Sequence, residues 1–144
     1  MESIIEKARE KLGNKVKNYF KKNEKRHYLE INPHDIIECT KIMFNGLESR
    51  FITATGVHLR TGFEIMYHFS YDKTGEVITL RVYLNEKDKP EIDSITPLIR
   101  GAEWIEREIW EMLGINFKNH PNMKRLLLAE DWPEGKYPLR QTEK

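Results

Sequence analysis

Six side chains of this 144-residue chain carry the nitrogen or sulfur atoms used in metal binding and proton transfer, namely five histidines and one cysteine. The histidines are His27, His34, His58, His68 and His120. No two of them are four residues apart, so no pair shares a helix face as zinc ligands do. His58 and His68 could meet across a hairpin, with Cys39 as a third ligand in a small metal-dependent enzyme. The alternative, which we favour, is that all three are hydrogen-bonded or exposed polar side chains.

Other motifs for catalysis or phosphate binding are missing from the sequence. The eight glycines occur singly, so no glycine-rich phosphate loop is predicted. His120 precedes Pro121, but no catalytic arrangement of carboxylate and nucleophile is evident around it, and we expect a structural hydrogen-bonding role in a loop. A single cysteine excludes an internal disulfide and a thiolate cluster. The residues therefore indicate a binding module without a catalytic site of its own.

The composition is that of a folded protein with balanced charge. The chain has 24 Lys and Arg against 23 Asp and Glu, and 39% of its residues are hydrophobic. A net charge of +1 gives no overall field that would attract nucleic acid or anionic lipid. Met1 is followed by charged residues, and no run of about 18 apolar residues occurs. We expect a soluble, intracellular protein with one domain over residues 1–144 and neither a signal peptide nor a membrane span.

Residues 4–20 have the pattern of an amphipathic helix. The apolar positions at helical spacing are Ile4, Ile5, Ala8, Leu12, Val16, Tyr19 and Phe20. Residues 15–26 are rich in lysine, which suits the negative end of a helix dipole. This stretch could also bind nucleic acid, but we favour a solvated helix end, which is the usual role of a run of like charges.

The sequence pattern of residues 32–84 predicts a helix followed by three strands. Asn32 and Pro33 suit a helix start, and Gly46 suits its end. Strands with alternating apolar residues are predicted at 50–58, 63–71 and 77–84. Gly75 suits the turn between the last two strands. The predicted fold class is α+β, a small, mainly antiparallel sheet covered by helices, with a C-terminal helix and an extended, irregular C-terminal tail.

A further helix is predicted over residues 102–113. Its apolar arc consists of Ala102, Ile105, Ile109, Met112 and Leu113. Glu103, Arg107 and Glu111 are predicted on the opposite face, paired four residues apart. Glu106 instead lies within the apolar arc. A carboxylate there needs a hydrogen-bonding or cationic partner, in this chain or another, because burying it unpaired costs on the order of several kcal/mol.

The segment after this helix, about residues 115–144, is apolar but has little secondary-structure pattern. Such a tail suggests burial against another surface. Trp104, Trp110 and Trp132 lie near or within it, and they suit either the core or a ligand cage, although aromatic residues are also enriched at protein interfaces. We favour the core for these three residues.

A family signature runs through and beyond this helix. It consists of the charged triplet at residues 106–108, the run from Glu111 to Ile115, Phe117, the His120–Pro121 pair and residues 124–127. In this spacing they resemble the 30 kDa (NuoC-type) subunit of respiratory complex I. Residues 130–132 and 137–140 resemble the closing segment of that family, and the hairpin at 63–84 resembles its strand pair. The resemblance covers about residues 47–140 and is densest from 103 to 132.

The resemblance implies a non-catalytic structural subunit in the peripheral arm of a membrane-bound, ion-translocating oxidoreductase. It implies packing against the large subunit, which is either NuoD-like with a quinone cavity or the nickel–iron subunit of an energy-converting hydrogenase. No cofactor is expected in this chain. Iron–sulfur clusters, and quinone or nickel–iron, are expected in the partner subunits. The implied location is peripheral, on the cytoplasmic side of the cell membrane and in contact with membrane subunits.

The family motif also implies a set of interface residues. These are Glu106, Arg107, Glu108, His120, Pro121, Lys124, Arg125 and Trp132. The alternative function, from a different class, is a free-standing nucleic-acid-binding module that uses residues 15–26.

Overall fold

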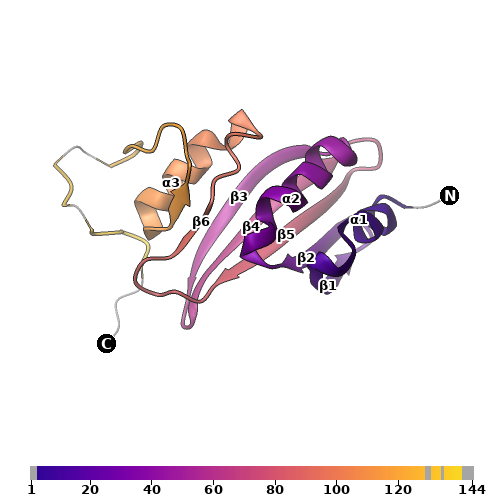
Figure 1. Ribbon diagram of the computed structural model, residues 1–144, viewed down its shortest axis with the longest axis horizontal. Coiled ribbons are helices and arrows are strands. Elements are labelled where there is room, and N and C mark those ends of the chain that lie inside the picture. Colours follow the sequence, from indigo (N-terminus) through magenta and orange to yellow (C-terminus); the bar gives the residue numbers. More distant parts are fainter. Residues whose placement is uncertain (1–2, 129–130, 134, 141–144) are drawn as a thin grey trace.

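A computed structural model describes residues 3–128, 131–133 and 135–140 (Figure 1). Its helices are α1 (Ile4–Leu12), α2 (Ile36–Lys41) and α3 (Glu103–Leu113). Its strands are β1 (Val16–Asn23), β2 (Arg26–Ile31), β3 (Arg50–Leu59), β4 (Gly62–Tyr71), β5 (Glu76–Leu84), β6 (Glu91–Asp93) and β7 (Asn116–Lys118). A π-helical turn at Ile42–Gly46 extends α2. The predicted α+β class is confirmed, as are the three central strands and the helix before the tail.

Five strands form the main sheet in the order β1-β2-β5-β4-β3. All neighbours are antiparallel except β2 and β5, which run parallel with Leu29 opposite Leu80. A second sheet consists only of β6 and β7, which are also parallel. Because β6 precedes α3 and β7 follows it, the three elements form a β-α-β unit with parallel strands.

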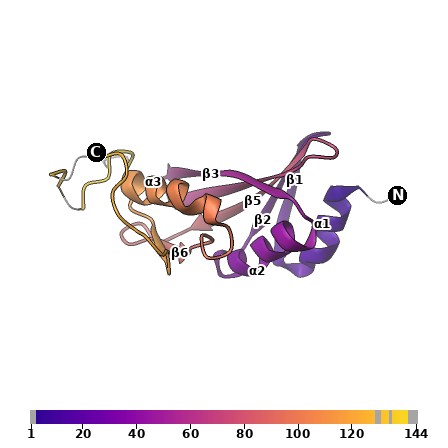
Figure 2. The ribbon, with the colours of Figure 1, turned by 90° about the horizontal axis from the view of Figure 1, so that it is seen from above.

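The core lies between one face of the main sheet and the helices. Phe63, Ile65, Tyr67 and Phe69 alternate along β4 and are all buried. The helices lie along one face of this sheet (Figure 2). Helix α3 approaches β3 so closely that a Cβ added at Gly56 would lie 2.8 Å from Cδ1 of Leu113. Glycine at this position therefore sets the spacing between α3 and the sheet.

The first helix is shorter than the predicted one over residues 4–20. It ends at Leu12, because Gly13 adopts φ +57° and turns the chain away from the helix. The lysine-rich segment that follows is the edge strand β1, and not the end of a helix. The sequence analysis also missed β2, although alternate residues His27, Leu29 and Ile31 are buried as in a half-buried strand.

The chain after α3 forms β7 and then runs back along the helix. Residues 119–128, 131–133 and 135–140 have little regular structure and lie at the opposite end of the molecule from α1 (Figure 1). Of the predicted tail, residues 129–130, 134 and 141–144 lie outside the described residues, and they include Glu130 of the family motif. Within the described ranges, no helix has the length and apolar character required to span a bilayer.

Candidate functional site

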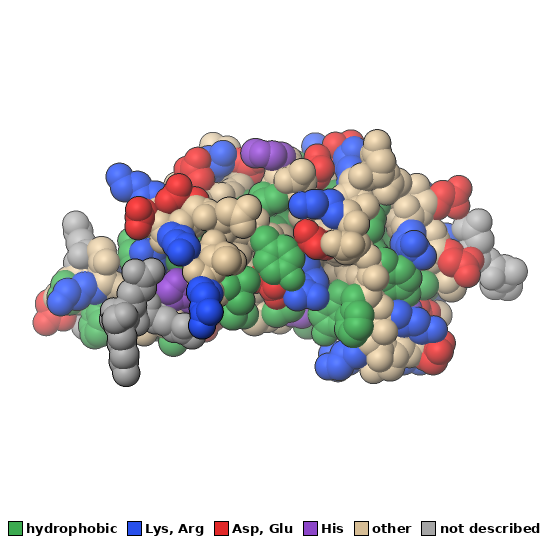
Figure 3. All heavy atoms as spheres, turned by 90° about the horizontal axis from the view of Figure 1, so that it is seen from below, with side chains coloured by type: hydrophobic (Ala, Val, Ile, Leu, Met, Phe, Trp, Pro, Cys, Tyr) green, Lys and Arg blue, Asp and Glu red, His purple; other side chains and the backbone are tan. Residues whose placement is uncertain are grey.

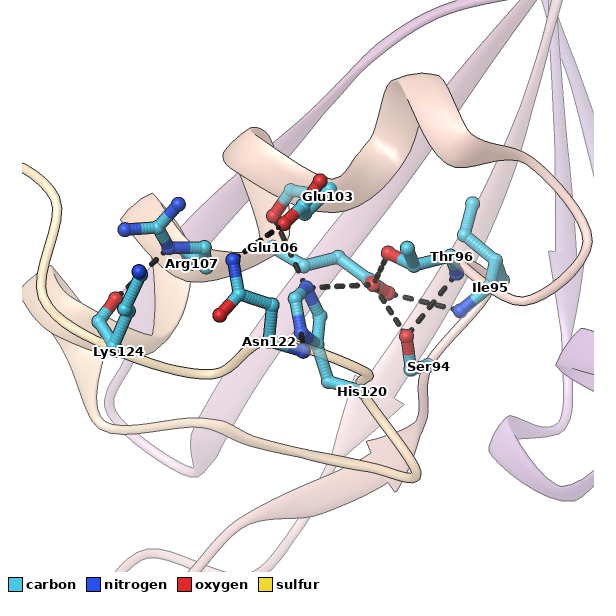
Figure 4. Close-up of polar contacts among 9 residues, drawn as sticks. All are labelled: Ser94, Ile95, Thr96, Glu103, Glu106, Arg107, His120, Asn122 and Lys124. Carbon is cyan, nitrogen blue, oxygen red and sulfur yellow. Dashed lines mark hydrogen bonds and ion pairs between the residues drawn. The ribbon is translucent and has the colours of Figure 1, made fainter.

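A buried carboxylate lies where the two short strands end. Glu106 of α3 has no exposed surface. One of its oxygens accepts hydrogen bonds from the Ser94 hydroxyl at 2.6 Å and from the Thr96 hydroxyl. The other oxygen accepts a bond from the backbone N–H of Ile95 at 3.0 Å. The predicted need of Glu106 for a partner is thus met within this chain, by the segment that follows β6 (Figure 4).

His120, in the segment that follows β7, contacts the same carboxylate. Its side chain is buried, and Nε2 lies 3.8 Å from Oε1 of Glu106. Nε2 is also 3.1 Å from the Glu103 carbonyl, and Nδ1 accepts a bond from the N–H of Asn122 at 3.0 Å. These bonds require the neutral tautomer with its hydrogen on Nε2, because Nδ1 already acts as an acceptor. His120 therefore donates toward α3 without placing a full positive charge beside Glu106.

The environment of Glu106 raises the pKa of its carboxyl group above the usual value. Burial raises its pKa, and the hydrogen bonds from Ser94, Thr96 and Ile95 only partly offset that effect. Tyr67, on β4, is fully buried and its hydroxyl has no hydrogen-bond partner among the described residues. Burial, followed by the charge of Glu106, raises the pKa of Tyr67 well above its usual range. Burial thus opposes negative charge on both Glu106 and Tyr67.

Two further charged residues of α3 hold the tail. The Arg107 guanidinium donates to the carbonyls of Lys124 at 2.9 Å and Arg125 at 2.8 Å. The Glu111 carboxylate accepts bonds from three consecutive backbone N–H groups. The donors are Leu126 at 3.1 Å, Leu127 at 2.8 Å and Leu128 at 2.8 Å. The prediction that Arg107 and Glu111 form an exposed ion pair is wrong. Both are buried, because the tail crosses that face of the helix.

The electrostatic state of Glu111 differs from that of Glu106. Partial burial alone would raise the pKa of the Glu111 carboxyl. The three backbone N–H groups outweigh burial and lower the pKa, since they bond best with the charged form. One helix thus carries a carboxyl group whose pKa is raised and, five residues later, one whose pKa is lowered.

The end of α3 is a third attachment point for the tail. Gly114 adopts φ +77°, and a Cβ there would lie 2.5 Å from the Tyr137 ring. Arg140 donates from Nε to the Leu113 carbonyl at 2.6 Å, and its guanidinium lies 4.7 Å from the centre of the Tyr137 ring. The returning tail therefore satisfies a carbonyl that the helix end leaves open.

The other predicted motif residues have different surroundings. Glu108 and Pro121 are exposed, and Lys124 and Arg125 contribute backbone carbonyls. Trp132 is partly exposed and donates from Nε1 to the Lys136 carbonyl at 2.8 Å. The preference for core positions is wrong for two of the three tryptophans. Trp110 packs against the core, whereas Trp104 is 66% exposed and Trp132 is 37% exposed.

The residues of the predicted metal site lie apart. Cys39 lies on the buried face of α2, where burial, followed by the charge of Asp35, raises the pKa of its thiol to about 12. His68 lies between the hydroxyls of Thr55 and Thr79, and His58 stacks on a phenylalanine ring. In the described part of the chain, no three His, Cys, Asp or Glu side chains form a group that could hold a metal ion. The hypothesis of a Cys39–His58–His68 site is therefore wrong.

The basic run at residues 15–26 lies along the β1 edge. Its lysines pair with carboxylates of this chain, namely Lys15 with Glu38, Lys17 with Glu30 and Lys21 with Glu24, at 3.5, 3.5 and 2.9 Å. Lysines on an edge strand also prevent unwanted strand pairing. Part of this positive charge is thus used to stabilise the fold.

Sequence reasoning missed Ser94, Thr96 and Arg140 as parts of the site. Hydroxyl residues that precede a helix containing a buried glutamate were a usable signal, because such a carboxylate needs donors. No periodic pattern could have located Arg140, since its contact depends on the course of an irregular tail.

Comparison with known proteins identifies the family of the chain. The profile of the family described as respiratory-chain NADH dehydrogenase, 30 Kd subunit, matches residues 29–144. The C subunit of the NADH-quinone oxidoreductase of Citrifermentans bemidjiense is 35% identical over 115 residues, which are 77% of this chain and 70% of that protein. The J subunit of the NAD(P)H-quinone oxidoreductase of Prochlorococcus marinus is 52% identical over 64 residues. That match spans 44% of this chain and only 34% of the relative.

Solved structures share the fold. A chain of the archaeal membrane-bound sulfane sulfur reductase, a respiratory membrane complex, superposes with a TM-score of 0.81 at 22% identity. This superposition covers 95% of the present chain and 81% of the other. A trypsin-resistant fragment of Nqo5 gives a TM-score of 0.59 at 23% identity, covering 83% and 96%. The family profile spans β3–β5, α3 and the residues that hold the tail, and the chain belongs to the family of 30 kDa subunits of the respiratory-chain NADH dehydrogenase.

Proposed function

We propose that this chain is a non-catalytic structural subunit of a membrane-bound respiratory oxidoreductase complex. Family membership supports this role, and the use of the motif charges supports it further. The side chains of Glu106, Arg107 and Glu111 form hydrogen bonds with the segments before and after α3. That pattern suits residues that shape a surface better than residues that react with a substrate.

The observation that carries the proposal is the exposure of large apolar side chains on α3 and on the tail that these charges hold in place. Trp104 is 66% exposed on α3, Leu127 is 61% exposed, and Leu139 is 59% exposed. All three lie on α3 or on the tail that it anchors. Exposed aromatic and aliphatic side chains on a rigid support are typical of a protein interface. Hydrophobic side chains are also visible among charged ones along the middle of the lower face (Figure 3).

A large subunit is the partner that the relatives suggest. The C/D subunit of the NADH-quinone oxidoreductase of Phocaeicola vulgatus is 39% identical over 80 residues, which are 56% of this chain and 15% of that protein. A name that joins C with D supports direct contact between this chain and a D-like subunit, or the nickel–iron subunit of a related hydrogenase. Our proposal places iron–sulfur clusters, and quinone or nickel–iron, in the partner subunits and none in this chain. It places the chain peripherally, on the cytoplasmic side of the membrane.

Affinity purification of the tagged chain from gently solubilised native membranes tests this function. Mass spectrometry should find a large subunit, iron–sulfur subunits and integral membrane subunits in stoichiometric amounts. Metal analysis of the same preparation should find iron, and nickel would identify a hydrogenase rather than a quinone reductase. Recovery of the tagged chain alone, from membranes in which the other subunits are detected, would contradict the proposal.

A further inference from the structure

Strand β3 is an open edge of the main sheet. It pairs with β4 on one side, and no described strand lies on the other. Every second N–H and C=O of an edge strand points away from the sheet without a ladder partner. The opposite edge, β1, carries Lys17, Lys21 and Lys22, which discourage pairing. Strand β3 has no Lys, Arg, Asp or Glu between Arg50 and Arg60, so this protection is lacking there.

A hollow of about 170 Å³ lies beside this edge, between β3 and α3. Its walls are mostly apolar. The lining includes Ala54 and Gly56 from the strand and Ile105, Ile109 and Met112 from the helix. An apolar cavity of about 150 Å³ is large enough to hold benzene. The hollow therefore has room for one aliphatic or aromatic side chain.

The rim of the hollow carries a negative charge. Glu108 lines it, is exposed, and forms no ion pair with any side chain in the described ranges. Its neighbours in the motif, Glu106 and Arg107, are used within the chain. A ligand that places an apolar group in the hollow would therefore complement the charge of Glu108 if it carried a cation next to that group.

The sheet face behind β3 offers a second apolar contact. Val57 is 36% exposed there, opposite Glu64 of β4. Side chains of an added strand alternate between the two faces of a sheet. One side chain of the added strand would therefore enter the hollow on the face that packs on α3. Its neighbours in the sequence would pack beside Val57 on the other face of the sheet.

We propose that β3 accepts an extended segment of a partner subunit as a sixth strand of the main sheet. The segment inserts one aliphatic or aromatic side chain into the hollow and places a Lys or Arg beside Glu108. This inference rests on the proposed role as a subunit and adds the surface and the chemistry of its partner. The backbone supplies the affinity, whereas the hollow and Glu108 select the sequence.

Hydrogen exchange, compared between the purified complex and the isolated full chain, tests the added strand. In the isolated chain, every second amide in residues 52–57 should exchange rapidly, since it faces away from β4. In the complex these outward-facing amides should exchange at least about tenfold more slowly, because they donate hydrogen bonds to the added strand. The outward-facing amides of β1 serve as the internal control and should not change.

Substitutions at the edge test the side-chain contacts. Val57→Lys and Glu108→Lys should each lower recovery of the partner with the tagged chain by at least about tenfold, whereas Glu10→Lys on exposed α1 should leave recovery unchanged. Both edge positions are exposed, so the urea midpoint of each isolated variant should match that of the wild type. Crosslinking from a photoreactive residue at position 57 identifies the segment, and replacing its Lys or Arg by Glu should restore recovery with Glu108→Lys.

The outcomes separate this inference from the proposed function. An intact complex in which the outward amides of β3 exchange as fast as in the isolated chain would overturn the added strand and leave the subunit role standing. Normal recovery of the partner with both Val57→Lys and Glu108→Lys would likewise overturn the added strand and leave the subunit role standing. If the tagged wild-type chain is recovered alone from membranes that contain the other subunits, both proposals fail.

Discussion

Arg107 and Glu111 lie one turn apart on α3 and bind one continuous piece of the tail with opposite polarity. Arg107 donates to two backbone carbonyls, and Glu111 accepts from the three N–H groups that come directly after them. A single helix face thereby satisfies five consecutive residues of irregular backbone. Such a segment has no sheet or helix partner, so these two side chains decide its path.

Glu111→Ala should release that segment. The N–H groups of Leu126, Leu127 and Leu128 lose a charged acceptor, a loss of roughly 1–3 kcal/mol in local stability. Hydrogen exchange at these three amides should accelerate about tenfold or more, while amides of β4 should keep their rates. Glu108→Ala, a change of the same type at an exposed position, should alter neither set. Unchanged exchange at all three amides in Glu111→Ala would contradict the role assigned to this carboxylate.

Glu106→Ala should destabilise the whole domain. It leaves the Ser94 and Thr96 hydroxyls and the N–H of Ile95 buried without their acceptor, at a cost of roughly 1–3 kcal/mol or more. Urea unfolding followed by far-UV circular dichroism measures the change. Glu10→Ala on the exposed face of α1 is the matched control, for which we expect a change within about 0.5 kcal/mol. A midpoint for Glu106→Ala equal to that of the control would show that the three donors find other partners.

The two buried carboxyl groups should give opposite pH dependences. The pKa of Glu106 is raised above 4.5 in the folded state, so the folded state binds more protons. Its contribution to stability therefore falls as pH rises from 4.5 through the folded-state pKa. The pKa of Glu111 is lowered below 4.5, so its contribution is present above 4.5 and is lost as pH falls through its folded-state pKa.

Stability measured against pH for two variants checks these signs. The cost of Glu106→Gln should be largest at acid pH and shrink as pH rises above 4.5. The cost of Glu111→Gln should instead grow as pH rises toward 4.5 and then stay constant. Parallel pH profiles for the two variants would show that the environments of the two carboxyl groups do not differ as described.

The sequence predicted the parts of this fold that follow a period. Alternation in residues 63–71 located β4, and helical spacing located α3 with Glu106 in its apolar arc. The failures arose where tertiary contacts override local pattern. Tyr19 and Phe20 suit a helix by spacing but lie in β1, because Gly13 ends the helix before them. Likewise, no local rule shows that the tail buries Arg107 and Glu111, since irregular backbone has no period.

Gly114→Ala should loosen the attachment of the tail at the end of α3. Alanine at φ +77° costs about 1 kcal/mol, and its Cβ would also displace Tyr137. We expect a loss of roughly 1–2 kcal/mol in unfolding free energy. Gly101→Ala provides the control, because its φ lies outside the left-handed region and a Cβ there would meet no atom within 4 Å. Equal stabilities of the two variants would argue against the close approach of Tyr137.

Tyr67→Phe should leave stability unchanged or raise it by up to about 1 kcal/mol. The hydroxyl is buried beside a carboxylate without a partner among the described residues, so its removal relieves an unpaired polar group. Tyr19→Phe is the contrasting control, because that hydroxyl lies 2.8 Å from Nδ1 of His27, and its loss should cost about 1 kcal/mol. A loss of more than about 1 kcal/mol in Tyr67→Phe would reveal a bound water or another partner for the Tyr67 hydroxyl.

The parallel pairing of β6 with β7 constrains the order in which parts of the chain fold. Strands β3 to β5 are joined by short turns and need no residue beyond 84 to pair with one another. The shell around Glu106 has to wait for His120, whose position depends on β7. During synthesis, the donors Ser94, Ile95 and Thr96 emerge before α3, whereas Glu106 can contact His120 only after the following residues have left the ribosome. Closure of the tail over α3 should therefore follow the pairing of strands β3 to β5.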